Sequence, residues 1–261
     1  GYVPNDRSFG SLPELPPFIL RFLYERGCQT PHHWNISRIL VAKRRFSFEL
    51  LEKTFRYLGD RHDALRIRFN LDGDRWQARV LETSQDTLAC KTVDLSNLSP
   101  EKQVEAIAKA TKVYQREINL INGPIAYMVL FELGKEQPQE LFFVVHHFAM
   151  DVISWKIFWL EFELAYQRLE ATGEITLSTL PVSFKTWTQV LRQYANSPKV
   201  ETDIQKWIRQ PWSEVPTLPK DLSDERSVNT NSSAEVVRFT LSEWQTETLM
   251  RSGTYELDVE H

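Results

Sequence analysis

The chain has 261 residues, 42% of them hydrophobic and 12% aromatic, which is enough for one sizeable core or two modest ones. Its formal net charge of −4 supplies no global basic field, so neither nucleic acid nor a membrane surface is expected as a partner. No apolar run approaches the roughly 18 residues of a membrane span, and the start of the chain lacks the order of a signal peptide, so the default expectation is a cytoplasmic protein. Cys28 and Cys90 are far apart and are expected to be buried thiols.

The first half of the chain predicts helices and strands in alternation. A helix is expected over residues 16–26, a strand over residues 34–42, and a helix that Ser47 caps. The alternation of apolar residues on both sides of Asp72 and Gly73 predicts a β-hairpin.

Further along, Ser99 and Pro100 open an amphipathic helix, and two buried strands follow, one within residues 121–133 and one at 140–147. The remaining predicted elements are a helix at 153–170 ended by Gly173, a helix capped by Ser183, a helix to about Gln210, a strand at 235–241 and a helix begun by Ser242. The polar stretch before that strand predicts a division into a lobe at residues 1–210, a connector at 211–234 and a crossover segment at 235–261.

The best chemical candidate is a histidine pair at the end of a buried strand, in "LFFVVHHFAMDVISW" (residues 141–155). Successive side chains of a strand point to opposite faces, so His146 and His147 cannot both enter one pocket, and only one should be chemical. Asp151 could orient an imidazole directly, or it could hold the loop by pairing with a buried cation such as Arg66. Spacing alone does not choose between these alternatives.

Other chemistries have weaker support. The chain contains no Gly-x-Gly, no phosphate loop, no Gly-x-Ser-x-Gly and no His-Glu-x-x-His. The histidine cluster offers too few convergent ligands for zinc, so no metal site is predicted. Ser154 and Cys28 have no visible partner that would activate them as nucleophiles.

Several segments together carry a family resemblance. "HHFAMDVISW" resembles the His-His-x-x-x-Asp-Gly signature of condensation and epimerization domains of nonribosomal peptide synthetases, which are similar to chloramphenicol acetyltransferase. "RHDALRIRF", "INLINGPIAYMVLFEL" and "PHHWNIS" resemble further segments of these domains. "VISWKIFWLEFELAYQRL" and "VSFKTWTQVLRQYANS" are most similar to the epimerization branch.

The resemblance implies a fold and roles for individual residues. The fold would be an α/β two-layer sandwich of the chloramphenicol acetyltransferase type, with a mixed sheet covered by helices. His147 would act at the reaction centre, with Asp151, Arg66 and His146 as structural support. Trp155 is expected in the core, and it and Ser154 are candidates for lining a substrate channel.

The resemblance also implies an activity and its partners. The substrate would be an aminoacyl or peptidyl thioester on the phosphopantetheine arm of a carrier protein, with no cofactor bound by the domain itself. Epimerization at the α-carbon is the first choice, amide-bond condensation is the second, and a catalytically silent docking platform is a third. Family members have two lobes, so the second lobe of the domain, or a partner chain, is expected to complete the site.

One residue of the signature departs from the family pattern. Val152 stands where the family has glycine. If that position required a positive φ angle, a β-branched residue there would force the loop to rearrange.

Overall fold

The computed structural model describes residues 10–12, 15–25, 30–83, 88–216, 219 and 235–253. The chain divides into two compact units, Gly1–Ile208 and Arg209–His261. Cys28 and the greater part of the predicted connector lie outside the described residues.

A four-stranded mixed sheet forms the centre of the first unit. Its strands run in the order β2 (Asn35–Val41), β7 (Glu140–His146), β6 (Ala126–Glu132) and β5 (Ala89–Asp94). Strand β7 pairs antiparallel with both of its neighbours, whereas β5 and β6 are parallel because helix α3 (Pro100–Glu117) connects them. The two buried strands predicted from the sequence are therefore adjacent.

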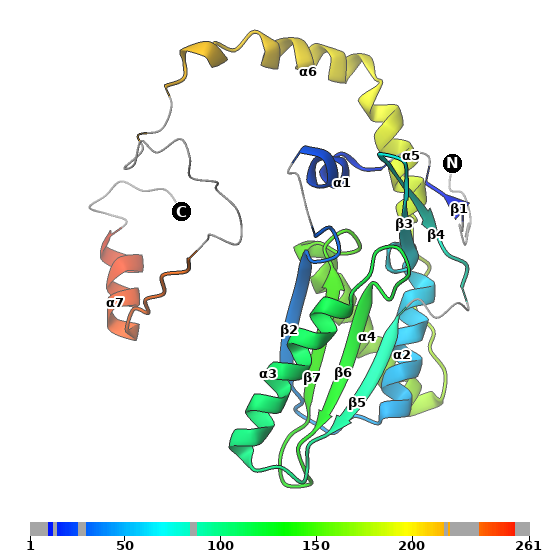
Figure 1. Ribbon diagram of the computed structural model, residues 1–261, viewed down its shortest axis with the longest axis vertical. Helices are drawn as coiled ribbons and strands as arrows, with labels where there is room; N and C mark the ends of the chain where they lie inside the picture. Colours follow the sequence, from blue (N-terminus) through cyan, green and yellow to red (C-terminus); the bar gives the residue numbers. More distant parts are fainter. Residues whose placement is uncertain are drawn as a thin grey trace. The chain divides into compact units, whose positions relative to one another are not determined.

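Helices cover both faces of this sheet. In Figure 1, α3 lies on one face, and α2 (Phe48–Arg61) and α4 (Val152–Thr172) lie on the other. Alternate residues of β7 divide between two cores, because Phe143 and Val145 pack toward α2 and α4, while Phe142 and Val144 pack toward α3. The predicted mixed sheet covered by helices is confirmed, and α3 adds a helical layer to the expected two.

A smaller sheet contributes Ile67, Phe69 and Val80 to the core that α2 and α4 cover. It consists of β1 (Gly10–Ser11), β4 (Arg75–Val80) and β3 (Ile67–Asp72), and the last two form the predicted hairpin. After β1 the chain forms α1 (Pro17–Leu20) and the π-helical turn η1 (Arg21–Glu25). A 3-10 turn, η2 (Asp63–Arg66), later leads from α2 into β3.

Local signals place the helix ends where the sequence predicts them. Side chains of Ser47 and Ser183 accept hydrogen bonds from the first turns of α2 and α5 (Phe184–Ala195), and α6 (Pro198–Ile208) follows. Gly173 ends α4 with a φ of 77°, a left-handed conformation that glycine adopts without steric cost.

The second unit confirms one prediction and corrects another. After a short turn, η3 (Trp212–Glu214), Ser242 forms a capping box with Gln245 at the start of α7 (Glu243–Thr248), which continues into η5 (Leu249–Gly253). The strand predicted at residues 235–241 is wrong, because that segment pairs with no other strand among the described residues. Alternating apolar residues there, such as Val237 and Phe239, remain exposed.

Candidate active site

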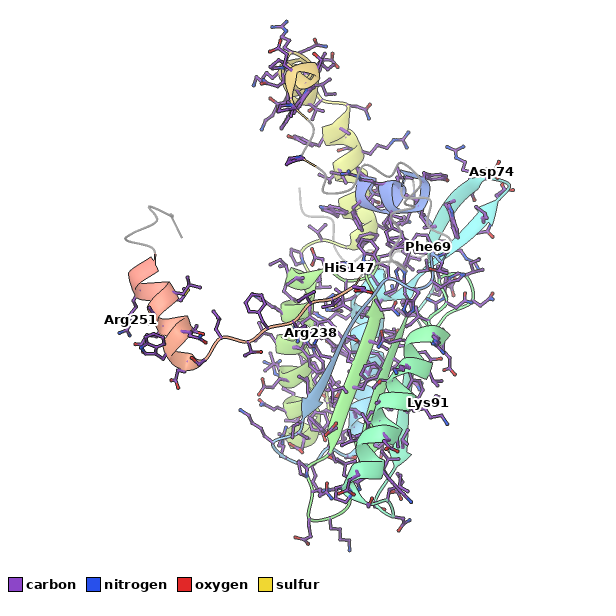
Figure 2. All side chains as sticks on the ribbon, turned by 60° about the vertical axis from the view of Figure 1, so that its left-hand side comes forward. Phe69, Asp74, Lys91, His147, Arg238 and Arg251 are labelled. Atoms are coloured by element: carbon purple, nitrogen blue, oxygen red, sulfur yellow. The ribbon has the colours of Figure 1, made fainter. Side chains whose placement is uncertain are left out.

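The histidine pair lies at the end of β7. It stands between the start of β2 and the loop that leads into β6. His146 is the last residue of β7 and stands opposite Asn35 of β2. His147 follows it and donates its backbone N–H to the carbonyl of Trp34, with an N···O distance of 2.8 Å. Figure 2 shows His147 at this end of the sheet, and Phe69 of the smaller sheet contacts the next residue, Phe148, with ring centroids 5.2 Å apart.

Both ring nitrogens of His146 are hydrogen-bonded within the fold. Its side chain is completely buried, and Nε2 lies 2.8 Å from the carbonyl oxygen of Pro31. Nδ1 lies 3.1 Å from the backbone nitrogen of Phe148 and accepts its N–H, so the proton of a neutral ring belongs on Nε2. Burial lowers the pKa of His146 from 6.5 to about 3. The ring therefore stays neutral at physiological pH and closes the turn after β7.

His147 has a different environment, as strand alternation predicted. Its side chain is partly exposed, and its ring stacks on the indole of Trp34 with the ring centroids 4.5 Å apart. Within the described part of the chain, no hydrogen bond reaches either imidazole nitrogen of His147. Among the described residues, both ring nitrogens of His147 are therefore without a hydrogen-bond partner.

Asp151 holds the start of helix α4. Its Oδ1 accepts the backbone N–H of Ser154 at 2.7 Å, and this hydrogen bond is the main cause that lowers the pKa of Asp151 below its ordinary value. The charge of His147 contributes a smaller lowering, which places the two groups within electrostatic range. Asp151 therefore positions the loop between His147 and α4 as a helix cap.

The predicted ion pair between Asp151 and Arg66 is wrong, because each side chain has other partners. Asp151 is exposed, whereas the side chain of Arg66 is buried and donates to the carbonyls of Gly59, Asp60 and Leu81 at 2.6–2.9 Å. No ion pair joins Arg66 to Asp151 among the described residues. Arg66 instead ties the end of α2 to the residue that follows β4.

Two carboxylates that the sequence analysis did not single out organise the segment before Arg66. Glu161 of α4 accepts two hydrogen bonds from Arg61 and one from His62, at 2.7–2.9 Å. Burial opposes ionisation of Glu161, but the contacts with His62 and Arg61 lower its pKa to about 2. Through this contact His62 helps to hold the end of α2 against α4.

Asp63, the second of these carboxylates, accepts the backbone N–H groups of Phe184 and Lys185 at 2.8 and 3.0 Å, which fixes the start of α5. A signal for Glu161 was available in the sequence, because this charged residue lies between Phe158 and Phe162 on the buried side of α4. No local pattern identifies the partner of Asp63, which is about 120 residues away.

The remaining predicted residues lie at the first turns of α4. Trp155 packs on Phe143, with ring centroids 5.2 Å apart, and Ser154 is exposed. Their role as channel-lining residues stays a prediction. Val152 is the first residue of α4 and has helical backbone geometry, so a side chain in place of glycine introduces no strain there.

No three His, Cys, Asp or Glu side chains in the described ranges come together as metal ligands. None of the helices in those ranges is both long and apolar enough to cross a membrane.

Comparisons with known proteins give consistent results. A family model described as a condensation domain matches residues 22–254. A component of the linear gramicidin synthase of Brevibacillus parabrevis is 32% identical over 98% of this chain, and chondramide synthase of Chondromyces crocatus is 30% identical over 94%. The chain spans only 3% and 6% of the lengths of these two relatives.

Solved structures confirm the predicted fold class. The epimerization domain from the third module of tyrocidine synthetase B superposes with a TM-score of 0.81 and 24% identity, over 97% of this chain and 56% of that chain. The starter condensation domain of rhizomide synthetase gives a TM-score of 0.63 and 20% identity, over 75% of this chain and 48% of that chain.

Proposed function

The chain belongs to the condensation-domain family of nonribosomal peptide synthetases, and from this premise we propose that it takes part in epimerizing the α-carbon of a thioester substrate. The substrate is an aminoacyl or peptidyl group on the phosphopantetheine arm of a carrier protein. The observation that carries the proposal is the partly exposed imidazole of His147, whose two nitrogens accept no hydrogen bond and donate none within the described residues.

In the proposed step, a ring nitrogen of His147 accepts the proton from the α-carbon. The electron pair of the broken C–H bond moves into the thioester carbonyl, which gives an enolate and an imidazolium. An acid on the opposite face then returns a proton to the α-carbon, and the imidazolium loses its proton to restore the base. No metal or organic cofactor is required, because the thioester itself accepts the electron pair.

Proton transfer on two faces of one carbon requires a group opposite His147. We assign that group to a second lobe, supplied by the same domain or by a partner chain. Apolar surface on α4 supports such a partner, since four residues at helical spacing are exposed by 42–70% of their surface: Ile153, Ile157, Leu160 and Leu164.

The segments around α4 and α5 favour epimerization over amide-bond condensation and over a docking platform. The sequence "VSFKTW", which resembles the epimerization branch, begins α5, and Asp63 anchors that helix to the Arg61–His62 turn. The solved epimerization domain also matches the fold over 97% of the chain, compared with 75% for the starter condensation domain.

Amide-bond condensation is the second candidate, because the starter condensation domain shares the fold of this lobe. In that reaction, His147 would accept a proton from the attacking amine while the amine forms a bond to the thioester carbonyl and the carrier thiol leaves. A docking platform for a carrier protein or tailoring enzyme would need no proton transfer at all.

The decisive experiment uses the full-length protein that carries this chain and a loaded carrier protein. Loss of deuterium from the α-carbon in the absence of bond formation indicates epimerization, whereas amide product indicates condensation. The substitution His147→Gln should lower the rate of deuterium loss at least about a hundredfold, because a positioned general base contributes on the order of 10²–10⁴.

The neighbouring His33→Gln is the matched control, since His33 is exposed and outside the proposed chemistry. It should keep the wild-type rate. Near-normal exchange in the His147 variant, or binding of the carrier protein with neither exchange nor amide formation, would reject the proposal.

A further inference from the structure

A general base must present its nitrogen in a fixed direction, and His147 lacks the usual means of doing so. Catalytic histidines are commonly oriented by a hydrogen bond to the second ring nitrogen. Within the described residues neither nitrogen of His147 has such a partner, because the carboxylate of Asp151 accepts from Ser154 instead. The last side-chain torsion of histidine has a broad energy profile, so the plane of the ring needs another restraint.

Trp34 supplies two contacts to the same residue. Its carbonyl accepts the backbone N–H of His147 at 2.8 Å, and its indole lies against the imidazole with an angle of 27° between the ring planes. A ring rotated away from the indole would lose this face-to-face contact. The two contacts together restrain both the backbone and the ring plane of His147.

The indole of Trp34 is itself held by two further aromatic side chains. Phe22 also stacks on Trp34, with ring centroids 4.2 Å apart and planes 3° from parallel. Phe148 meets both Phe22 and Trp34 edge-on, at centroid distances of 5.3 and 5.9 Å. Phe22 and Phe148 thus leave the indole of Trp34 little room to move when a substrate approaches His147.

We propose that Trp34 is a positioning residue for His147, which fixes the imidazole plane by stacking in place of a hydrogen bond. The inference rests on the proposed role of His147 as a proton-transfer group. An indole face also attracts a cation within about 6 Å of its centre, so it stabilises the imidazolium formed when the ring holds the substrate's proton. Stacking leaves both nitrogens free, which a hydrogen-bonded orienting partner would not.

Two measurements test this role. In the 261-residue chain, nuclear magnetic resonance of the His147 ring protons should show an upfield ring-current shift that disappears in Trp34→Leu and is partly kept in Trp34→Phe. In the full-length protein, Trp34→Leu should lower kcat about tenfold to a hundredfold with little change in KM, because misplacing a reacting group by about 1 Å can cost a hundredfold. Trp34→Phe should recover most of that loss.

The matched control is Trp159→Leu. Trp159 belongs to the same core, contacting Phe143, Phe158 and Phe162, and makes no ring contact with His147. This variant should leave both the His147 resonances and kcat unchanged, whatever it does to thermal stability.

Wild-type kcat in Trp34→Leu, or unchanged His147 resonances in that variant, would overturn the positioning role. Failure of the proposed function gives a different result, since His147→Gln would then keep its turnover while the ring-current shift persisted in the wild-type chain.

Discussion

The turn at residues 61–66 and the loop at residues 146–151 differ in how they use their polar side chains. In the first, Arg61 and His62 bind one carboxylate, Asp63 binds two backbone N–H groups, and Arg66 binds three carbonyls. In the loop at 146–151, His146 and Asp151 are bound in a similar way, but the ring nitrogens of His147 are not.

This difference separates structural from chemical residues better than residue type does. A buried polar side chain that satisfies backbone groups stabilises the fold, and it cannot leave those bonds to bind a substrate without a free-energy cost. An imidazole that is held only by backbone and stacking contacts can bind a substrate through its nitrogens without first breaking a hydrogen bond. The two regions therefore predict opposite responses to substitution.

The largest loss of stability is expected at Arg66. The substitution Arg66→Met keeps the length of the side chain but removes the donors to three carbonyls, and should lower the free energy of unfolding by at least about 3 kcal/mol. Urea denaturation measures this loss. Arg56→Met on the exposed face of α2 is the control and should change stability by less than about 0.5 kcal/mol. Equal losses in the two variants would show that the contacts of Arg66 do not stabilise the fold.

A smaller loss is expected at Glu161. Glu161→Gln removes the charge that Arg61 and His62 bind, and should cost about 1.5–3 kcal/mol, the range for hydrogen bonds to charged groups. Because the folded-state pKa of Glu161 is lowered to about 2, its contribution is present above its ordinary pKa of 4.5 and disappears as the pH falls toward 2.

Urea denaturation of Glu161→Gln near pH 7 and near pH 3 checks both statements. The difference from the wild type should narrow at the lower pH. Glu163→Gln, an exposed change on the same helix, should show almost no difference at either pH. A gap for Glu161→Gln that is unchanged at pH 3 would contradict the assigned charge.

Local signals in the sequence account for the fold and for part of the site. Ser47, Ser183 and Gly173 mark helix ends through bonds and backbone angles within a few residues, so the sequence predicts them directly. The strand period of two likewise predicts that His146 and His147 have different environments. Such predictions succeed because each depends on neighbours along the chain.

Contacts between distant residues are where prediction from the sequence fails. Asp63 and Phe184 are 121 residues apart, and Trp34 and His147 are separated by more than a hundred positions. Charge and the family resemblance together predict a pairing of Asp151 with Arg66, but the nearby N–H of Ser154 satisfies that carboxylate instead. The strand predicted at residues 235–241 depends on a partner strand, which no local pattern can supply.

His146 offers a pH-dependent test of the comparison. Its pKa is about 3 in the folded chain and 6.5 when unperturbed, so between these values the unfolded chain binds a proton that the folded chain does not. Stability from the neutral ring is therefore complete above pH 6.5 and is lost as the pH falls. From pH 6.5 to pH 5, a span of 1.5 pH units at about 1.4 kcal/mol each, the loss is about 2 kcal/mol.

The variant His146→Gln can still donate to the carbonyl of Pro31 but does not titrate. Its stability, measured by urea denaturation, should fall less than that of the wild type between pH 6.5 and pH 5. Identical slopes for the wild type and His146→Gln would mean that His146 is not held neutral by burial.

The smallest effect is expected at Asp151, and it tests whether that residue acts through its hydrogen bond or through its charge. Asp151→Ala removes the cap of α4 and should cost about 1 kcal/mol, whereas Asp151→Asn keeps a capping oxygen and should cost a few tenths. Ser47→Ala, which removes the equivalent cap of α2, should match the stability loss without affecting turnover.

Turnover then separates the two roles of Asp151. If the residue serves as a cap that positions the loop, Asp151→Asn should keep the rate of deuterium exchange within about threefold of the wild type, because Asn keeps the capping oxygen. A threefold change in rate corresponds to well under 1 kcal/mol in the activation free energy. Because the pKa of Asp151 is lowered in the folded chain, the wild-type cap should weaken as the pH falls below its ordinary pKa of 3.8, and the Asn cap should not. A large loss of exchange in Asp151→Asn at unchanged stability would instead assign the charge of Asp151 a direct part in the chemistry of His147.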